Sequence, residues 1–120
     1  MILGIDHVQI AAPPGCEKTA LRFFGELLGL PEIEKPANLA ARGGAWFQSG
    51  NQQLHIGVES EFMPAKKAHP AFAVREIARL RERLESHGIV TDPGEPLPGA
   101  ERFYVSDPFG NRLEFLEWKP

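Results

Sequence analysis

The sequence repeats itself at a nearly fixed offset, and this feature constrains the fold more than any other. Each half contains a short alternating stretch, then an amphipathic helical stretch that stops at a glycine, and then two further alternating stretches. The two helix stops, Gly29 and Gly88, lie 59 positions apart, and the same offset separates His55 from Glu114. Similarity at a fixed offset indicates a duplicated structural unit.

The hydrophobic spacing predicts the elements of each half. Alternation predicts strands over residues 5–12, around 40–48 and over 52–59, and helical spacing predicts a helix over residues 16–28. Residues 60–68 carry Pro64 and two lysines and are expected to form a linker.

The second half repeats this order. Strands are expected over residues 69–74, 102–106 and 112–118, and a helix over residues 75–87. The last two strands are joined by Asp107-Pro108-Phe109-Gly110-Asn111, which has the residues of a tight turn: Asp accepts from the backbone, Pro fixes φ, and Gly closes the turn.

Length and charge exclude several classes of protein. The 120 residues suit one domain over 1–120, with a first module of about 1–60 and a second of about 68–120. The net charge of −3 and the absence of a basic stripe argue against a nucleic-acid partner. No apolar run is long enough to span a membrane, and the first residues do not resemble a signal peptide. The single cysteine, Cys16, suits a reducing compartment, so a cytoplasmic location is expected.

Four polar residues interrupt the apolar patterning at equivalent places in the two halves. Side chains alternate between the faces of a strand, so each of the four lies opposite the apolar face on which a helix is expected to pack. They are His7, His55, His69 and Glu114. His7 and His69 are 62 positions apart, close to the offset of the other pair. If a pseudo-twofold axis relates the halves, the four residues converge on it.

Three imidazoles and one carboxylate suit a divalent ion such as Zn, Ni, Fe or Mn. Four protein ligands on an octahedral ion would leave two positions for substrate or water, which supports Lewis-acid chemistry. Glu114 could also serve as the catalytic base. A single histidine on a strand is more often structural, and His87, at a helix end, is assigned no function.

The chain resembles the vicinal oxygen chelate superfamily, which includes glyoxalase I, methylmalonyl-CoA epimerase, fosfomycin-resistance thiol transferases, extradiol dioxygenases and bleomycin-binding proteins. The resemblance rests on residues 6–10 (DHVQI), 69–74 (HPAFAV) and 107–115 (DPFGNRLEF). It implies an α+β fold of two βαβββ modules whose mixed sheet curls around a central cup holding a metal, commonly in a homodimer. His7, His69 and Glu114 fall where family enzymes place ligands. His55 departs from the Glu of glyoxalase I and the Gln of the epimerase.

The leading hypothesis is a metal-dependent enzyme acting on a small oxygen-rich substrate, with glyoxalase-like lyase or isomerase chemistry ahead of dioxygenase chemistry. The alternatives are a metal-free binding protein of the bleomycin-resistance type and a domain kept for assembly. The candidate substrate-binding residues are Arg42, Trp46, Arg102 and Tyr104. Either arginine could hold a carboxylate or simply be exposed, and Trp46 could equally be a core or dimer contact.

Overall fold

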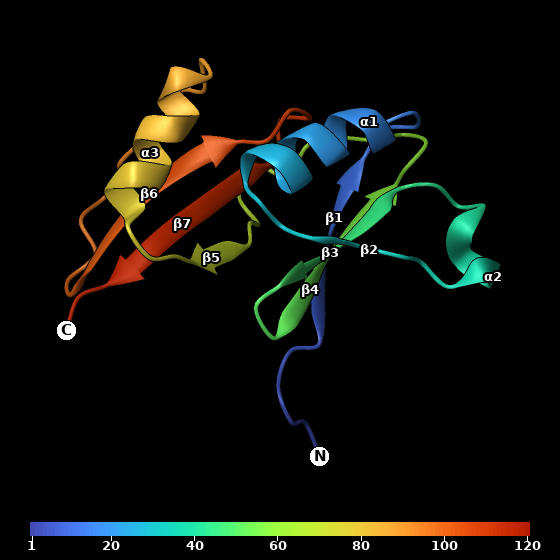
Figure 1. Ribbon diagram of the computed structural model, residues 1–120, viewed down its shortest axis with the longest axis horizontal. Helices are drawn as coiled ribbons and strands as arrows, with labels where there is room; N and C mark the ends of the chain where they lie inside the picture. The colour runs from blue at the N-terminus through green and yellow to red at the C-terminus, as the bar shows by residue number, and fades with distance from the viewer. The chain divides into compact units, whose positions relative to one another are not determined.

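The computed structural model describes residues 1–120, and the chain divides into two compact units, Met1–Pro64 and Ala65–Pro120. Each unit contains one mixed β-sheet and few helices (Figure 1), so the predicted α+β fold is confirmed. None of the helices has the length and apolarity needed to cross a bilayer.

The first unit is built on a four-stranded sheet with the strand order β1-β4-β3-β2. β1 runs parallel to β4, whereas β3 is antiparallel to both β4 and β2. The elements of this unit are β1 (His7–Ala12), α1 (Glu17–Ala20), η1 (Leu21–Leu27), β2 (Glu32–Ile33), α2 (Ala37–Ala40), β3 (Ala45–Ser49) and β4 (Gln52–Val58).

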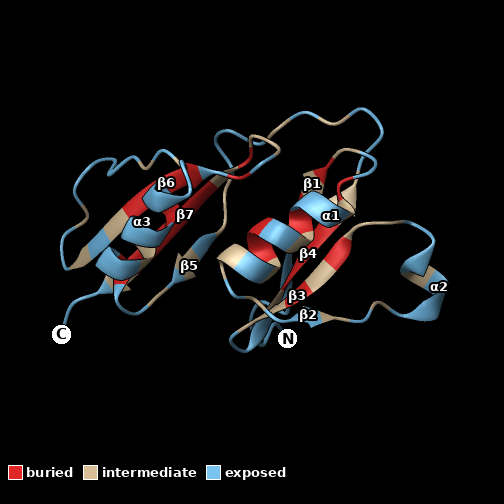
Figure 2. Ribbon diagram, turned by 45° about the horizontal axis from the view of Figure 1, so that its top comes forward, coloured by how far each residue is buried: buried red, intermediate tan, exposed pale blue.

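One face of this sheet forms the core of the first unit. α1 and η1 together occupy the stretch predicted as one helix, and η1 has π-helical hydrogen bonding. Figure 2 shows buried residues along this helical segment and along the strands that it covers. The rings of Phe24 and Phe47 lie 5.9 Å apart, and Leu54 and Ile56 of β4 are fully buried. Apolar residues two apart on a strand share a face, as the sequence pattern predicted.

The predicted strand around residues 40–48 is wrong at its beginning, and neither α2 nor β2 was predicted. β3 starts only at Ala45, because Gly43 and Gly44 adopt left-handed backbone angles (φ +76° and +80°) that a strand does not contain. The Gly44 amide donates to Oε2 of Glu17 at 2.6 Å, which ties the start of β3 to α1. This hydrogen bond lowers the pKa of Glu17.

The second unit has the strand order β5-β7-β6, with β5 parallel to β7 and β6 antiparallel to it. Its elements are β5 (Ala71–Ala73), α3 (Ile77–Ser86), β6 (Ala100–Ser106) and β7 (Arg112–Trp118). A single antiparallel bridge joins Asp92 to Tyr104 on the outer side of β6. This is the position that β2 occupies beside β3 in the first unit, so the two units share one strand order.

α3 packs on the apolar face of the second sheet (Figure 2). Its Ile77 and Leu84 are buried, and the rings of Phe103 and Phe115 beneath it lie 5.3 Å apart. The carboxylate of Glu117 on β7 accepts hydrogen bonds from the first amides of the helix, including the Ile77 amide at 3.1 Å. A strand side chain therefore satisfies donors that the helix itself leaves unpaired.

The turn between β6 and β7 has the predicted chemistry. The Gly110 amide donates to the Asp107 carbonyl, and Oδ1 of Asp107 accepts from the amides of Phe109 and Asn111. The Asn111 side chain in turn accepts from the Ala65 amide at 2.9 Å. Burial nevertheless raises the pKa of Asp107 above its ordinary value.

Candidate functional site

The strand register places the four candidate ligands at equivalent positions in the two units. His55 on β4 pairs with Gln9 on β1, two positions after His7. Glu114 on β7 pairs with Ala71 on β5, two positions after His69. The offset in the sequence therefore relates equivalent places in the two sheets. In each sheet, one candidate ligand lies on or just before the edge strand (β1 or β5), and the other lies on the inner strand beside it (β4 or β7).

His69 lies just before β5, not on it as predicted. Pro70 follows it, and a proline lacks the amide proton that a ladder hydrogen bond needs, so the strand begins at Ala71. The Pro70 carbonyl still accepts from the Glu114 amide at 3.1 Å, which keeps the chain alongside β7. His69 consequently reaches Glu114 from outside the strand.

In the first unit, three aromatic rings stack on the open face of the sheet. The ring of His55 lies 4.1 Å from that of His7 and 3.8 Å from that of Trp46, and it is nearly parallel to both. Trp46 is the residue directly opposite His55 on β3. Enclosed between these rings, His55 is only 4% exposed. Burial, followed by the neighbouring charge of His7, lowers the pKa of His55 and favours its neutral form.

Hydrogen bonds orient both of these imidazoles. Nδ1 of His7 lies 2.9 Å from Oδ1 of Asp6, and Nε2 of His55 lies 2.9 Å from Oε1 of Gln53. A carboxylate or amide oxygen beside one ring nitrogen fixes a proton there and leaves the other nitrogen as an acceptor. In the neutral form of each ring, the acceptor atom is thus Nε2 of His7 and Nδ1 of His55.

In the second unit, His69 and Glu114 are in direct contact. Nε2 of His69 lies 2.9 Å from Oε1 of Glu114, and its Nδ1 donates to the Lys67 carbonyl, also at 2.9 Å. The second carboxylate oxygen of Glu114 lies 3.4 Å from Nη1 of Arg102. Arg102 is itself fixed by two hydrogen bonds to the Glu95 carbonyl. The Glu114 side chain, 8% exposed, is therefore held from both sides.

Tyr104 lies beside this pair, directly opposite Glu114 on β6. Its ring meets that of His69 edge-on at 5.5 Å, and the guanidinium groups of Arg102 and Arg112 lie 5.3 Å and 4.0 Å from its centre. Sequence reasoning did not single out Arg112. The period of two along β7 could have found it, because a residue two positions before Glu114 shares its face.

The remaining substrate candidate, Arg42, is exposed and lies in the turn after α2, because the strand predicted there begins later. It lines a small cavity of about 190 Å³ together with Trp46, Gln9 and Lys35. Lys35 donates to the Gly43 carbonyl. Arg42 and Trp46 therefore share one cavity in the first unit, while Arg102 and Tyr104 surround Glu114 in the second.

The structure thus brings the four candidate ligands together as two pairs, His7 with His55 and His69 with Glu114. Neither unit by itself gathers three or more His, Cys, Asp or Glu side chains that could hold a metal ion. The donor types still suit a divalent ion, because each pair supplies nitrogen or carboxylate ligands with oriented partners.

Comparison with known proteins agrees with this fold. The profile of the Glyoxalase/Bleomycin resistance protein/Dioxygenase superfamily matches residues 4–115. A crystal structure of a glyoxalase family protein from Bacillus anthracis is 55% identical, with a TM-score of 0.96 over 99% of this chain and 98% of that one. No curated protein sequence matches the chain significantly.

Two more distant structures share the fold. Lactoylglutathione lyase from Agrobacterium tumefaciens is 19% identical, with a TM-score of 0.76 over 97% of this chain and 94% of that one. The fosfomycin resistance protein FosX from Listeria monocytogenes is 18% identical, with a TM-score of 0.76 over 96% and 91% of the two chains. The chain belongs to the glyoxalase/bleomycin resistance protein/dioxygenase superfamily.

Proposed function

We propose that this protein is a divalent-metal-dependent enzyme that acts on a small oxygen-rich substrate. Glyoxalase-like lyase or isomerase chemistry is favoured over dioxygenase chemistry. The observation that carries the proposal is the contact between His69 and Glu114, where Nε2 and Oε1 lie 2.9 Å apart while the other ring nitrogen donates to a backbone carbonyl. The hydrogen bond from Nδ1 to a backbone carbonyl is the kind that orients metal-binding histidines, and it leaves Nε2 to bind an ion that Oε1 of Glu114 would also bind.

The spacing of this pair suits two ligands of one ion. Two ligand atoms bound at right angles, each about 2.1 Å from the ion, lie about 3.0 Å apart. The observed separation of 2.9 Å between Nε2 and Oε1 is close to this value. We assign His7, His55, His69 and Glu114 as the ligands, with Zn, Ni, Fe and Mn all compatible with three imidazoles and a carboxylate.

Glu114 is the residue that we assign to proton transfer. A divalent ion bound by these ligands would polarise a substrate carbonyl and acidify the neighbouring C–H bond. Glu114 would take the proton on Oε1 after this oxygen leaves the ion, while Arg102 holds its other oxygen in place at 3.4 Å. Arg42, Trp46, Arg102 and Tyr104 are assigned to the binding of the substrate.

The first test is the metal content of the protein, purified without an affinity tag. We expect one divalent ion per four-ligand set, and a protein that carries none and cannot be loaded would overturn the proposal. His87→Ala is the matched control, since this exposed histidine only bonds within its own helix end, at 2.8 Å from the Arg83 carbonyl. It should leave the metal content unchanged.

We further propose a homodimer, in the cytoplasm, that binds neither nucleic acid nor membranes. In this proposal the two ligand pairs of one ion come either from one chain or from two copies. Dilution below the dissociation constant of the dimer distinguishes these cases. Release of the metal upon dilution would support a site shared between two copies, and a monomer that keeps its metal would contradict it.

The alternative is a metal-free protein that binds a drug or metabolite. One observation favours it: no buried side-chain nitrogen or oxygen lacks a hydrogen-bond partner, so no buried atom of the candidate ligands is left for a metal ion to satisfy. Thermal-shift measurements with metals, chelator and ligands separate the two functions. Stabilisation by an organic ligand that is insensitive to chelator would support the alternative, whereas stabilisation by metal supports the enzyme.

A further inference from the structure

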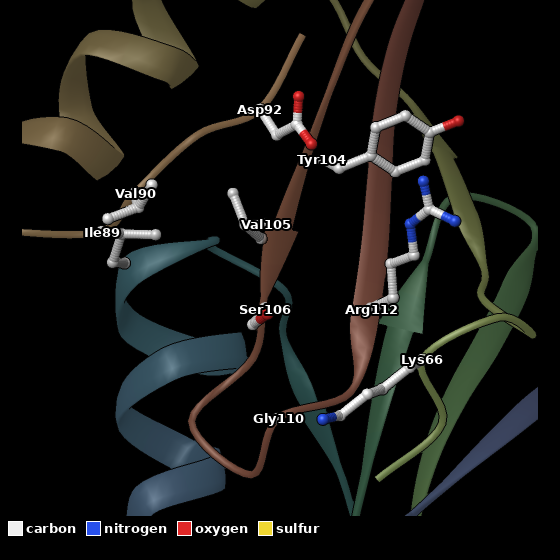
Figure 3. A pocket seen from close by; sticks show the side chains of 9 residues that line it. All are labelled: Lys66, Ile89, Val90, Asp92, Tyr104, Val105, Ser106, Gly110 and Arg112. Carbon is white, nitrogen blue, oxygen red and sulfur yellow. The ribbon is translucent and has the colours of Figure 1, made fainter. Parts of the chain in front are cut away.

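A cavity of about 620 Å³ opens in the second unit, beside the ends of β6 and β7 (Figure 3). This volume lies within the range of small-molecule binding sites, which is roughly 300–1,000 Å³. We call it the Lys66–Arg112 pocket after the two cationic residues that line it. Tyr104 also lines it, and Tyr104 stands directly opposite Glu114.

The two cations of the pocket have no carboxylate partner in the ion pairs of this protein. Arg79, Arg81 and Arg102, by contrast, each pair with a glutamate. The guanidinium of Arg112 instead stacks over the ring of Tyr104 at 4.0 Å, which fixes its plane without neutralising its charge. A positioned guanidinium with free N–H groups matches the two oxygens of a carboxylate.

The wall formed by the loop after α3 and by β6 is apolar. Ile89, Val90 and Val105 line it, and Val90 is 84% exposed. Figure 3 shows these side chains on the side of the pocket away from Arg112. An exposed aliphatic surface that faces two cations suits a ligand with an anionic group and an apolar body.

One acidic residue limits the charge of the ligand. Asp92 lines the same pocket, and in Figure 3 it lies at the end opposite Lys66. Its Oδ1 accepts from the Gly94 amide at 2.9 Å, which holds the carboxylate in place. With two cations and one anion in the lining, a singly charged ligand is matched better than a dianion such as phosphate.

We propose that the Lys66–Arg112 pocket binds a small organic carboxylate with an aliphatic or aromatic body. This inference rests on the proposed function, because it makes this carboxylate the substrate class of the site at Glu114. The geometry supports that link: Arg112 precedes Glu114 by two positions on β7, on the same face, and Tyr104 borders both residues.

The test is calorimetric titration of the full chain, as purified, with 4-methylpentanoate and 3-phenylpropanoate. The probes for comparison are 4-methylpentanamide, which lacks the charge, and inorganic phosphate, which lacks the apolar body. We expect each carboxylate to bind at least tenfold more tightly than either comparison probe. Equal binding of the amide would overturn the role of the cations, and equal binding of phosphate would overturn that of the apolar wall.

Variants locate the binding. Lys66→Met and Arg112→Met should each weaken carboxylate binding at least tenfold, and Lys66 is exposed, so its replacement does not endanger folding. Arg79→Met is the matched control, since this 82% exposed side chain lies on α3 outside the pocket, and it should change nothing. Carboxylate binding that survives both pocket variants would overturn the inference.

The metal content of the same samples keeps the two proposals separate. If a protein that carries no metal and cannot be loaded binds the carboxylates through Lys66 and Arg112, the pocket is supported and the metal-dependent function fails. If the protein holds its metal but the carboxylates do not bind, the inference fails and the metal-dependent function stands.

Discussion

Nε2 of His69 lies 2.9 Å from Oε1 of Glu114, although 45 residues separate them in the chain. The contact results from the parallel pairing of β5 with β7, which sets Ala71 opposite Glu114. Because His69 lies outside the strand and Glu114 within it, the contact depends on the register of that pairing. A shift by one residue would turn Glu114 to the opposite face of the sheet.

Glu114→Gln should weaken divalent-metal affinity at least 100-fold, because it removes the only carboxylate of the proposed ligand set. Removal of a residue that only hydrogen-bonds to a metal ligand typically lowers the metal affinity 10–100-fold, so a larger decrease indicates that the residue is itself a ligand. Metal stoichiometry and competition with a chromogenic chelator measure the change. Glu82→Gln, an exposed substitution on α3, is the control and should bind metal like the unmodified protein. Equal affinity in both variants would contradict the assignment of Glu114.

Trp46→Leu should lower the free energy of unfolding by about 1–2 kcal/mol, because it removes the ring that encloses His55 at 3.8 Å. Trp46→Phe should retain most of this stability, since a smaller ring can still stack. Trp118→Leu provides the comparison, because Trp118 is 62% exposed and should contribute less than about 0.5 kcal/mol. Urea denaturation of the three variants gives the values, and similar losses for Trp46→Leu and Trp118→Leu would argue against the stack.

Gly44→Ala should be among the most destabilising single substitutions in the first unit. A Cβ atom at this position would lie 2.0 Å from the Ile56 carbonyl oxygen, and the φ of +80° is strained for any residue with a side chain. We expect a loss of about 3 kcal/mol or more. Gly88→Ala measures the cost of the left-handed backbone angle alone, because φ of Gly88 is +79° and no atom lies within 4 Å of the added Cβ. It should lower the free energy of unfolding by about 1–2 kcal/mol. Thermal or urea unfolding that ranks the two equally would be inconsistent with the clash.

Glu117→Gln should destabilise the protein at neutral pH and much less in acid. The backbone amide of Ile77 is the main cause of the lowered pKa of Glu117 in the folded chain. A carboxyl whose pKa falls on folding stabilises the folded state above its unfolded pKa of about 4.3, and this contribution disappears as the pH falls through the folded pKa. Urea midpoints should therefore differ between the two proteins from pH 8 to 6 and converge as the pH falls through the lowered folded-state pKa of Glu117.

Glu101→Gln controls for the loss of a surface charge. Glu101 pairs with the same lysine as Glu117, at 3.2 Å from Lys119 Nζ, but it accepts no backbone amide of α3. Its effect on stability should be small and nearly independent of pH. A difference between Glu117→Gln and the unmodified protein that persists unchanged at low pH would show that the hydrogen bonds to α3 do not depend on the charge.

The strands and their buried faces could be predicted wherever apolar alternation was regular. β4 was expected over residues 52–59 and spans Gln52–Val58, while β7 was expected and observed over residues 112–118. In both strands burial of the apolar face leaves one candidate ligand, His55 or Glu114, on the other side. Period-two alternation sufficed because the helix that covers each sheet selects the same face along the whole strand.

The partners of those residues could not be predicted in the same way. The sequence places Trp46 on a strand expected around residues 40–48, and only the pairing of β3 with β4 sets it against His55. The contact between Arg102 and Glu114 likewise depends on the β6–β7 register together with the Glu95 carbonyl that holds the guanidinium. Alternation fixes the face of a residue, but it carries no information about which residue of another strand lies opposite.

The sequence by itself determined the offset between two similar halves, the α+β class and the strand faces of His55 and Glu114, because these depend on local periodicity and on the comparison of the two halves. Only the tertiary structure decided that His55 is enclosed between two rings and that His69 contacts Glu114 from outside a strand. It also revealed Arg112 beside Tyr104. These features arise from strand register and side-chain packing, which bring together residues that are distant along the chain.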